Sequence, residues 1–254
     1  MNKKYLIPLI ALVCFQPHLF SRGNTESPIL VATDATWPPM EYIDSEGNLV
    51  GFDIDLMREI ADRAGFHVEF ESVPWDGIFF GLTANRYDMI ASSVTILPER
   101  EKVMLFSIPY FTAAQYLVVR NEERTVSSLS DLQGNDVGAE IATTGAWYID
   151  REPNVNLRSY DDLGLAIEDL VNGRLAGVVA DTAILEYYVF NKEEYRSRLR
   201  VAGDAYAVEQ YGFAIRQDRA DLKDTVNRAL IEIRQDGTYD ELFAKWFPSF
   251  TVEE

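Results

Sequence analysis

The residues with the clearest capacity for chemistry lie between Ser92 and Arg100, where three hydroxyl side chains precede Pro98, Glu99 and the arginine. Residues 88–91 read as a short buried strand, and a proline followed by a glutamate suits the first turn of a helix. A turn from strand to helix exposes unpaired backbone N–H groups, and an arginine can hold a carboxylate through two parallel hydrogen bonds. The stretch therefore predicts an anion site, although a plain helix start with a solvated Arg100 fits the pattern equally well.

The elements that would position these residues alternate between strands and helices. We expect strands at 29–33, 68–73, 88–91, 114–120, 136–140, 156–160, 176–180 and 211–215, a hairpin at 41–50, and helices at 52–64, 75–85, 143–151, 161–172, 220–234 and 237–247. The first of these helices has apolar residues at helical spacing and ends at Gly65. This alternation predicts an α/β fold of open sheets with a parallel core.

Two stretches of the chain repeat one plan. Residues 68–92 and 156–181 each read as strand, aromatic turn, helix and a second strand with a polar end. Any two βαβ units share this outline, so the repetition alone does not establish a relationship. If it reflects two similar lobes, each lobe would place polar residues at the carboxyl ends of its strands, where open α/β sheets bind ligands. A cleft between two such lobes would be a preferred small-molecule site.

The start of the chain predicts export from the cytoplasm. Two lysines precede an apolar run over residues 5–15, and polar and small residues follow up to Gly23. This is the pattern of a signal peptide, which we place at residues 1–23, and the apolar run is too short to span a bilayer. The alternative is a lipid anchor on Cys14, but a lipid-attachment cysteine normally follows a small residue, and Val13 precedes this one. We expect a periplasmic or extracytoplasmic protein and favour ordinary cleavage over lipid anchoring.

Composition argues against several classes of function. Of the 254 residues, 47% are hydrophobic, which allows a packed core and argues against disorder. Loss of the signal peptide would leave 20 basic residues against 41 acidic ones, a formal charge of −21 that repels nucleic acid and anionic membranes. If Cys14 leaves with the signal peptide, the mature chain has no thiol for disulfides, nucleophilic catalysis or metal binding. We expect no nucleic-acid partner.

Standard catalytic and nucleotide-binding motifs are absent from the chain. GxSxG, HExxH, phosphate-loop and GxGxxG patterns do not occur. The mature chain keeps one histidine, His67, which has no evident catalytic partner in sequence and suits a structural role. An enzyme would have to work with carboxylates alone, and we expect no cofactor and no metal.

Short motifs typical of one family occur in order through the mature chain. They are residues 32–39 (ATDATWPP), 51–56 (GFDIDL), 73–77 (VPWDG), 92–95 (SSVT), 98–100 (PER), 107–110 (SIPY), 143–145 (TTG) and 179–181 (VAD). In these motifs the chain resembles the polar amino-acid-binding proteins of bacterial ABC importers, the periplasmic solute-binding proteins of family 3. The resemblance covers essentially the whole mature chain and is specific for the family but not for the ligand.

The resemblance implies the type II periplasmic-binding-protein fold, an α/β fold in which two lobes with open sheets are joined by two hinge strands. Residues 28–115 and 212–254 would form lobe 1 and residues 116–211 lobe 2, with hinge crossings near 116–120 and 208–213. Ligand binding would close the lobes by hinge bending, driven by contacts that exist only when both lobes touch the ligand.

The resemblance also implies a set of ligand-binding residues. They are Asp34, Trp37, Trp75, Ser92, Ser93, Thr95, Arg100, Glu140, Thr143, Thr144 and Asp181. Arg100 would clamp the α-carboxylate of an amino acid. Hydroxyl and backbone groups of Ser93, Thr95 and Thr144 would add donors to that carboxylate. The helix start at Arg100 departs from the family, because Leu97 stands where a capping threonine is common.

The α-ammonium group would be taken by Asp181, together with the carbonyl or hydroxyl of Ser92 or Ser93. A zwitterion that leaves water needs both of its charges paired, because the desolvation free energy of an unpaired buried charge exceeds the favourable free energy of binding. Asp181 could instead only cap a helix, and one residue can serve both roles.

The side-chain end of the implied pocket contains Asp34, Trp37, Trp75 and Glu140. The two tryptophans would sandwich the ligand side chain, although core packing explains each of them equally well. Glu140 stands where the family often has a neutral polar residue or lysine, and Ala142 where it often has glycine. Glu140 beside Asp34 would make this end negative, which favours a cationic side chain such as that of arginine, lysine or ornithine. Histidine and glutamine remain open, as does a Glu140 that points away at the hinge.

We therefore predict an extracytoplasmic substrate-binding protein of an ABC transporter that captures a polar, cationic L-amino acid and delivers it to the membrane permease. It would be a monomer, perform no chemistry and bind its ligand at roughly micromolar affinity or better. The alternative is a secreted cyclohexadienyl or prephenate dehydratase-like enzyme on the same fold, with Glu140 as general acid. The chain lacks the glycine-asparagine pattern that we associate with that branch, so the binding protein is favoured.

Overall fold

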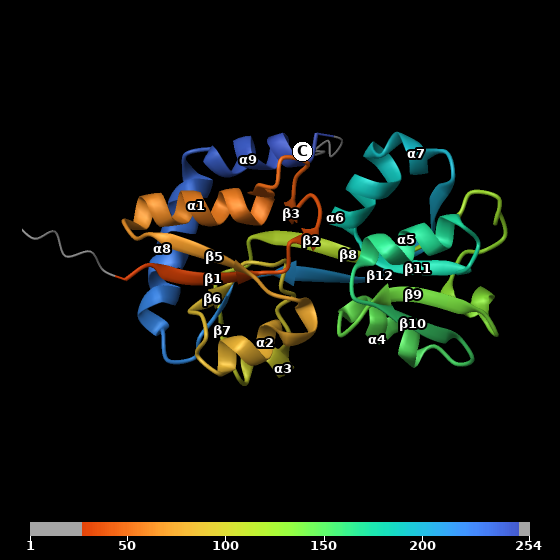
Figure 1. Ribbon diagram of the computed structural model, residues 1–254, viewed down its shortest axis with the longest axis horizontal. Coiled ribbons are helices and arrows are strands. Elements are labelled where there is room, and N and C mark those ends of the chain that lie inside the picture. Colours follow the sequence, from red (N-terminus) through yellow and green to blue (C-terminus); the bar gives the residue numbers. More distant parts are fainter. Residues whose placement is uncertain (1–26, 249–254) are drawn as a thin grey trace, which may run out of the picture.

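The computed structural model describes residues 27–248, which form two α/β halves side by side (Figure 1). The predicted signal peptide, its cleavage point after Gly23 and Cys14 lie outside the described residues. Within residues 27–248 no helix combines the length and the apolar character needed to cross a membrane.

The first half is built on a five-stranded sheet in the order β5-β1-β6-β13-β7. Its strands are β1 (Ile29–Thr33), β5 (Val68–Ser72), β6 (Met89–Ile90), β7 (Leu105–Phe106) and β13 (Ala214–Ile215). β5 and β6 both run parallel to β1, whereas β13 is antiparallel to β6. The carboxyl ends of β1 and β6 therefore meet at one edge of the sheet, and Asp34 and Ser92 follow them there.

Helices cover this sheet and bury its apolar side chains. They are α1 (Phe52–Ala64), α2 (Trp75–Thr83), α3 (Pro98–Glu101), α8 (Ala220–Gln235) and α9 (Thr238–Trp246). The predicted helix at 52–64 is confirmed at both ends, and Gly65 closes it with a φ of 75° that suits glycine. Its apolar stripe, which includes Leu56 and Ile60, is fully buried against residues of α8 such as Val226. This packing holds α1 in place, and with it the hairpin that directly precedes α1.

The predicted hairpin over residues 41–50 belongs to a small three-stranded sheet in the order β2-β3-β4. Its strands are β2 (Thr36–Trp37), β3 (Glu41–Ile43) and β4 (Leu49–Val50). Gly51 follows with a φ of 139°, and a Cβ atom there would lie 2.0 Å from the carbonyl oxygen of Met40. The N–H of Asp53 donates to the same carbonyl oxygen at 2.9 Å. These contacts tie the hairpin to the start of α1, so that Glu41 and Asp53 lie close together.

The second half is built on a five-stranded sheet in the order β10-β9-β11-β8-β12. The strands are β8 (Phe111–Arg120), β9 (Asp136–Glu140), β10 (Asn156–Tyr160), β11 (Gly177–Asp181) and β12 (Leu199–Tyr211), and the helices are η1 (Leu129–Leu132), α4 (Thr144–Arg151), α5 (Leu163–Val171), α6 (Thr182–Ile184), η2 (Leu185–Asn191) and α7 (Glu193–Arg196). β9 runs parallel to β10 and β11, so that Glu140 and Asp181 end neighbouring parallel strands.

The two halves are joined by the long antiparallel strands β8 and β12 (Figure 1). β8 begins before the predicted strand at 114–120, and most of β12 was not predicted. The single strand predicted at 211–215 is wrong, because β12 ends at Tyr211 and β13 starts at Ala214. Residues 182–196, for which no element was predicted, form α6, the π-helix η2 and α7. The lobe boundaries at 115/116 and 211/212 stay predictions.

Candidate ligand-binding site

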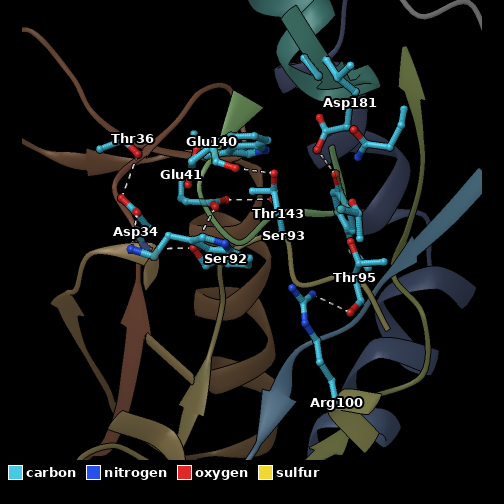
Figure 2. A pocket seen from close by; sticks show the side chains of 17 residues that line it. Asp34, Thr36, Glu41, Ser92, Ser93, Thr95, Arg100, Glu140, Thr143 and Asp181 are labelled. Carbon is cyan, nitrogen blue, oxygen red and sulfur yellow. Dashed lines mark hydrogen bonds between the residues drawn. The ribbon is translucent and has the colours of Figure 1, made fainter. Parts of the chain in front are cut away.

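All of the predicted ligand-binding residues line one cavity, to which both halves of the protein contribute. The cavity wall also includes residues that the sequence analysis did not single out, namely Thr36, Glu41, Gln115, Val179, Ala180 and Tyr211. Figure 2 shows Asp34, Glu41 and Ser92 on one side, Asp181 on another and Arg100 reaching in from α3. Ligand contact by these residues stays a prediction.

Arg100 is a buried cation without an acidic partner. Its side chain is 8% exposed, and α3 begins at Pro98 as predicted. One guanidinium nitrogen, Nη1, donates to the carbonyl oxygen of Thr95 at 2.9 Å, and no Asp or Glu oxygen of residues 27–248 lies within 4.0 Å of the group. Burial lowers the pKa of Arg100 to about 10, an effect that the negative charge of Glu209 opposes, so the group stays charged at neutral pH. Its unused N–H donors favour an anion at this wall.

The two tryptophans of the cavity differ in their surroundings. Trp75 packs edge-on against Phe79 and belongs to a buried cluster, so the core-packing interpretation holds for part of its surface. The guanidinium of Arg100 lies 5.5 Å from the Trp75 ring centre and 4.5 Å from that of Phe79. Trp37 packs against the apolar cores of both halves. The indole N–H groups of both tryptophans are buried without a hydrogen-bond partner in the described protein.

Asp34 and Glu140 form an acidic wall. Asp34 accepts hydrogen bonds from Thr36 Oγ1 at 2.9 Å and from the backbone N–H of Trp75 at 2.7 Å, and burial raises its pKa. Glu140 ends β9 and is 2% exposed, and its Oε2 has no hydrogen-bond partner among residues 27–248. Burial, and then the charge of Asp34, raises the pKa of Glu140 to about 9. Glu140 therefore lines the cavity wall, where a positively charged partner would stabilise its ionised carboxylate.

The loop after Glu140 presents the start of α4 to the cavity. Ala142 has a φ of 59°, a left-handed conformation that suits glycine better than alanine. Thr143 caps α4, because its Oγ1 accepts from the N–H of Ala146 at 3.2 Å. The first N–H groups of an α-helix have no partner inside the helix, so those of Thr144 and Gly145 are suited to an anion.

Asp181 is both a helix cap and part of the cavity wall. It is 3% exposed, and its Oδ1 accepts from the N–H groups of Ala183 at 3.1 Å and Ile184 at 3.3 Å. Its Oδ2 accepts from the hydroxyl of Tyr211, which is also buried. Burial raises the pKa of Asp181 to about 6, so the group is ionised at neutral pH. The capping interpretation is thus confirmed, and the same carboxylate faces the cavity.

Two buried glutamates that the sequence analysis missed hold the hydroxyls of the cavity. Glu41 accepts from Ser92 Oγ at 3.0 Å and from Ser93 Oγ at 3.2 Å. Glu209 on β12 accepts through Oε2 from Thr95 Oγ1 at 3.1 Å and from Thr144 Oγ1 at 2.9 Å. Nothing in local sequence points to these pairs, because 52 residues separate Ser93 from Glu41 and 114 separate Thr95 from Glu209.

Comparison with known proteins identifies the family. The chain matches the model of the bacterial extracellular solute-binding proteins, family 3, over residues 29–249. The chain belongs to this family. A probable histidine-binding protein of Neisseria gonorrhoeae is 36% identical to this solute-binding protein over 222 residues, which cover 85% of this chain and 82% of that protein. ABC transporter arginine-binding protein 1 of Escherichia coli (strain K12) is 32% identical over 250 residues, which cover 98% and 100%.

Solved structures confirm the fold of this solute-binding protein. An ancestral arginine-binding protein bound to arginine aligns with a TM-score of 0.83 at 36% identity, covering 88% of this chain and 99% of that protein. The predicted two-lobed α/β fold with two joining strands is thereby confirmed. These relatives are named as amino-acid-binding proteins, so the prediction of a binding protein is confirmed.

Proposed function

We propose that this solute-binding protein captures an L-amino acid with a cationic side chain in the cavity between its two halves and delivers it to the membrane permease of an ABC transporter. The observation that carries the ligand class is the distribution of buried basic and acidic groups. Arg100 lies at one wall without an acidic partner among residues 27–248, whereas Asp34, Glu140 and Asp181 are buried at the other walls.

The two charged ends of an amino acid match two of these walls. The α-carboxylate would lie against the guanidinium of Arg100 and the free N–H groups at the start of α4. The α-ammonium would lie against Asp181, which stays ionised at neutral pH. Because each ligand charge meets a buried opposite charge, the pairing repays the cost of removing both from water.

A cationic side chain would reach the acidic wall between the two tryptophans. Glu140 offers an unpartnered Oε2 there, and the neighbouring charge of Asp34 adds to the negative potential. The faces of Trp37 and Trp75 would contribute cation–π attraction. The names of the relatives that bind arginine and histidine support this choice of ligand.

Binding would be coupled to hinge bending. The cavity wall comes from both halves and from the joining strand β8, so a bound ligand stabilises the arrangement in which the halves meet. Residues 28–115 with 212–254 would move against residues 116–211. We further propose that the protein is exported by the signal peptide at 1–23 and acts as a monomer.

A thermal-shift screen of the purified mature protein, residues 24–254, against the common L-amino acids and L-ornithine tests this proposal. We expect L-arginine, L-lysine, L-ornithine or L-histidine to raise the melting temperature, with a stabilisation of about 2.7 kcal/mol at a hundredfold excess over Kd. D-arginine is the matched control, because it carries the same charges with the α-substituents exchanged. A shift with neutral amino acids alone would contradict the cationic ligand, and no shift with any of them would contradict amino-acid binding.

A further inference from the structure

Glu41 has no role in the proposed contacts, yet it is one of the most deeply buried acids of the cavity wall. It is 1% exposed and lies close to a second buried acid, Asp53, which is 0% exposed. No Lys or Arg nitrogen of residues 27–248 lies within 4.0 Å of either carboxylate. Burial, and then the charge of Asp53, raises the pKa of Glu41 well above its usual value, and a ligand ammonium group nearby would favour the ionised carboxylate that accepts from the serines.

The backbone around Ser93 is held in an unfavourable conformation by these two acids. Ser93 has a φ of 50°, which side chains other than glycine seldom adopt. Its N–H donates to Asp53 Oδ2 at 2.8 Å, and its hydroxyl donates to Glu41 Oε2 at 3.2 Å. Backbone strain of this kind persists only where several surrounding contacts hold the residue in that conformation, and it is concentrated at ligand sites.

The hydrogen bonds of Glu41 decide what the two serines can offer a ligand. A hydroxyl has one hydrogen and two acceptor lone pairs. Ser92 Oγ gives its hydrogen to Glu41 at 3.0 Å and accepts from the N–H of Asp34 at 2.9 Å. Ser93 Oγ also gives its hydrogen to Glu41, which leaves its lone pairs for the cavity (Figure 2). While its hydrogen is engaged by the ionised Glu41, Ser93 can accept a hydrogen bond from a ligand but cannot donate one to it.

We propose that Glu41 is a positioning residue that orients the Ser93 hydroxyl as an acceptor for the ligand's α-ammonium group. The inference rests on the proposed function, because it assigns the ammonium end of the same ligand. The sequence analysis leaves the Ser93 hydroxyl open to either the carboxylate or the ammonium of the ligand, and the inference assigns it to the ammonium. Glu41 thereby helps the protein distinguish an amino acid from a carboxylic acid with the same side chain.

The test compares L-arginine with 5-guanidinopentanoic acid, which has the same carboxylate and side chain but no α-amino group. In Glu41→Gln, the amide NH₂ replaces one acceptor oxygen, so a serine hydroxyl must turn toward the cavity as a donor. We expect calorimetry to show about tenfold or greater weakening for L-arginine, from the value of a hydrogen bond to a charged group. The affinity for the analogue should change by less than about twofold, because it lacks the group that Ser93 binds.

Ser93→Ala provides an independent variant, because it removes the acceptor and leaves Glu41 in place. It should weaken the binding of L-arginine selectively, as Glu41→Gln does. The double variant should bind L-arginine only slightly more weakly than Ser93→Ala, since both substitutions remove the same interaction. Glu186→Gln is the matched control: Glu186 is likewise buried, at 2% exposed, and accepts a hydrogen bond from Asn191, but it does not line the cavity. It should leave the ratio of the two affinities unchanged.

Equal losses for both ligands in Glu41→Gln would overturn the inference, because a structural role weakens the site without regard to the α-amino group. If Glu41→Gln does not fold, equal losses in Ser93→Ala would overturn it. If the wild type binds another amino acid in the screen, that amino acid and its des-amino analogue replace the pair. Failure of the wild type to bind any amino acid would refute the proposed function itself.

Discussion

Replacing Arg100 by methionine tests the carboxylate clamp most directly. Methionine keeps much of the apolar stem that packs near Phe79 and Trp75 but removes the charge and its donors. Truncating one partner of a buried, hydrogen-bonded charge pair costs about 2–5 kcal/mol of binding energy. Affinity for L-arginine should therefore fall by roughly 30-fold to several thousandfold.

The same substitution should not destabilise the protein in the absence of ligand. The guanidinium is buried without an acidic partner among residues 27–248, and its one protein hydrogen bond is to the carbonyl oxygen of Thr95. Burial of an uncompensated charge opposes folding, so its removal offsets the lost hydrogen bond. We expect an unchanged or higher melting temperature without ligand, together with a lost ligand-induced shift.

Arg200→Met is the matched control for Arg100→Met. Arg200 donates to the carbonyl oxygens of Val201 and Val126 at 3.1 and 2.7 Å, has no acidic oxygen of residues 27–248 within 4.0 Å, and lies outside the cavity and the predicted hinge segments. We expect a lower melting temperature and an unchanged affinity, the reverse of the Arg100 result. Calorimetry that found Arg100→Met within about threefold of the wild-type Kd would refute the clamp, since so small a change is below 1 kcal/mol.

Three further substitutions test other parts of the site. Glu140→Gln should raise the melting temperature relative to wild type increasingly as the pH rises from 4.5 to about 9, because the folded protein keeps a proton that the unfolded chain releases. It should also abolish the rise in L-arginine affinity toward pH 9 that calorimetry of the wild type should show, since a ligand cation favours ionised Glu140. Ala142→Gly should stabilise the protein by about 0.5–1 kcal/mol in urea unfolding, because relief of left-handed strain exceeds the entropy cost; a destabilised variant would contradict this. Asp181→Asn should keep the helix cap, so the free energy of unfolding should change by less than about 0.5 kcal/mol. Calorimetry should show L-arginine binding about 10- to 100-fold more weakly, and unchanged affinity would contradict the ammonium contact.

Elements with strong local signals were predictable from the sequence. The helix at 52–64 and the strands at 136–140 and 156–160 have the predicted bounds. In the helix, apolar side chains recur at helical spacing and Gly65 supplies the left-handed ending, so neighbouring residues contain the required information. The π-helix at 185–191 and most of β12 lack such signals, and they form because distant segments pack against them.

The family motifs were sufficient to predict which residues would gather in one cavity, because type II fold topology brings the carboxyl ends of several strands together. The roles of their hydroxyls were not predictable. The motif leaves the Ser93 hydroxyl open as a donor to the carboxylate or an acceptor for the ammonium, whereas in the folded protein it donates to Glu41. The direction of a hydrogen bond depends on a partner 52 residues away, and a local motif contains no trace of that partner.

Sequence by itself determined the α/β fold class and the order of most elements, since these follow from local periodicity. The resemblance of its motifs to a family then predicted a set of residues that line one cavity. Only the tertiary structure decided the electrostatics of the site. It buried Arg100 with no acidic oxygen of residues 27–248 within 4.0 Å, and it placed Glu41 and Glu209 against the cavity hydroxyls. Burial and long-range pairing set the charge state and the hydrogen-bonding direction of each group, and both exist only once the chain has folded.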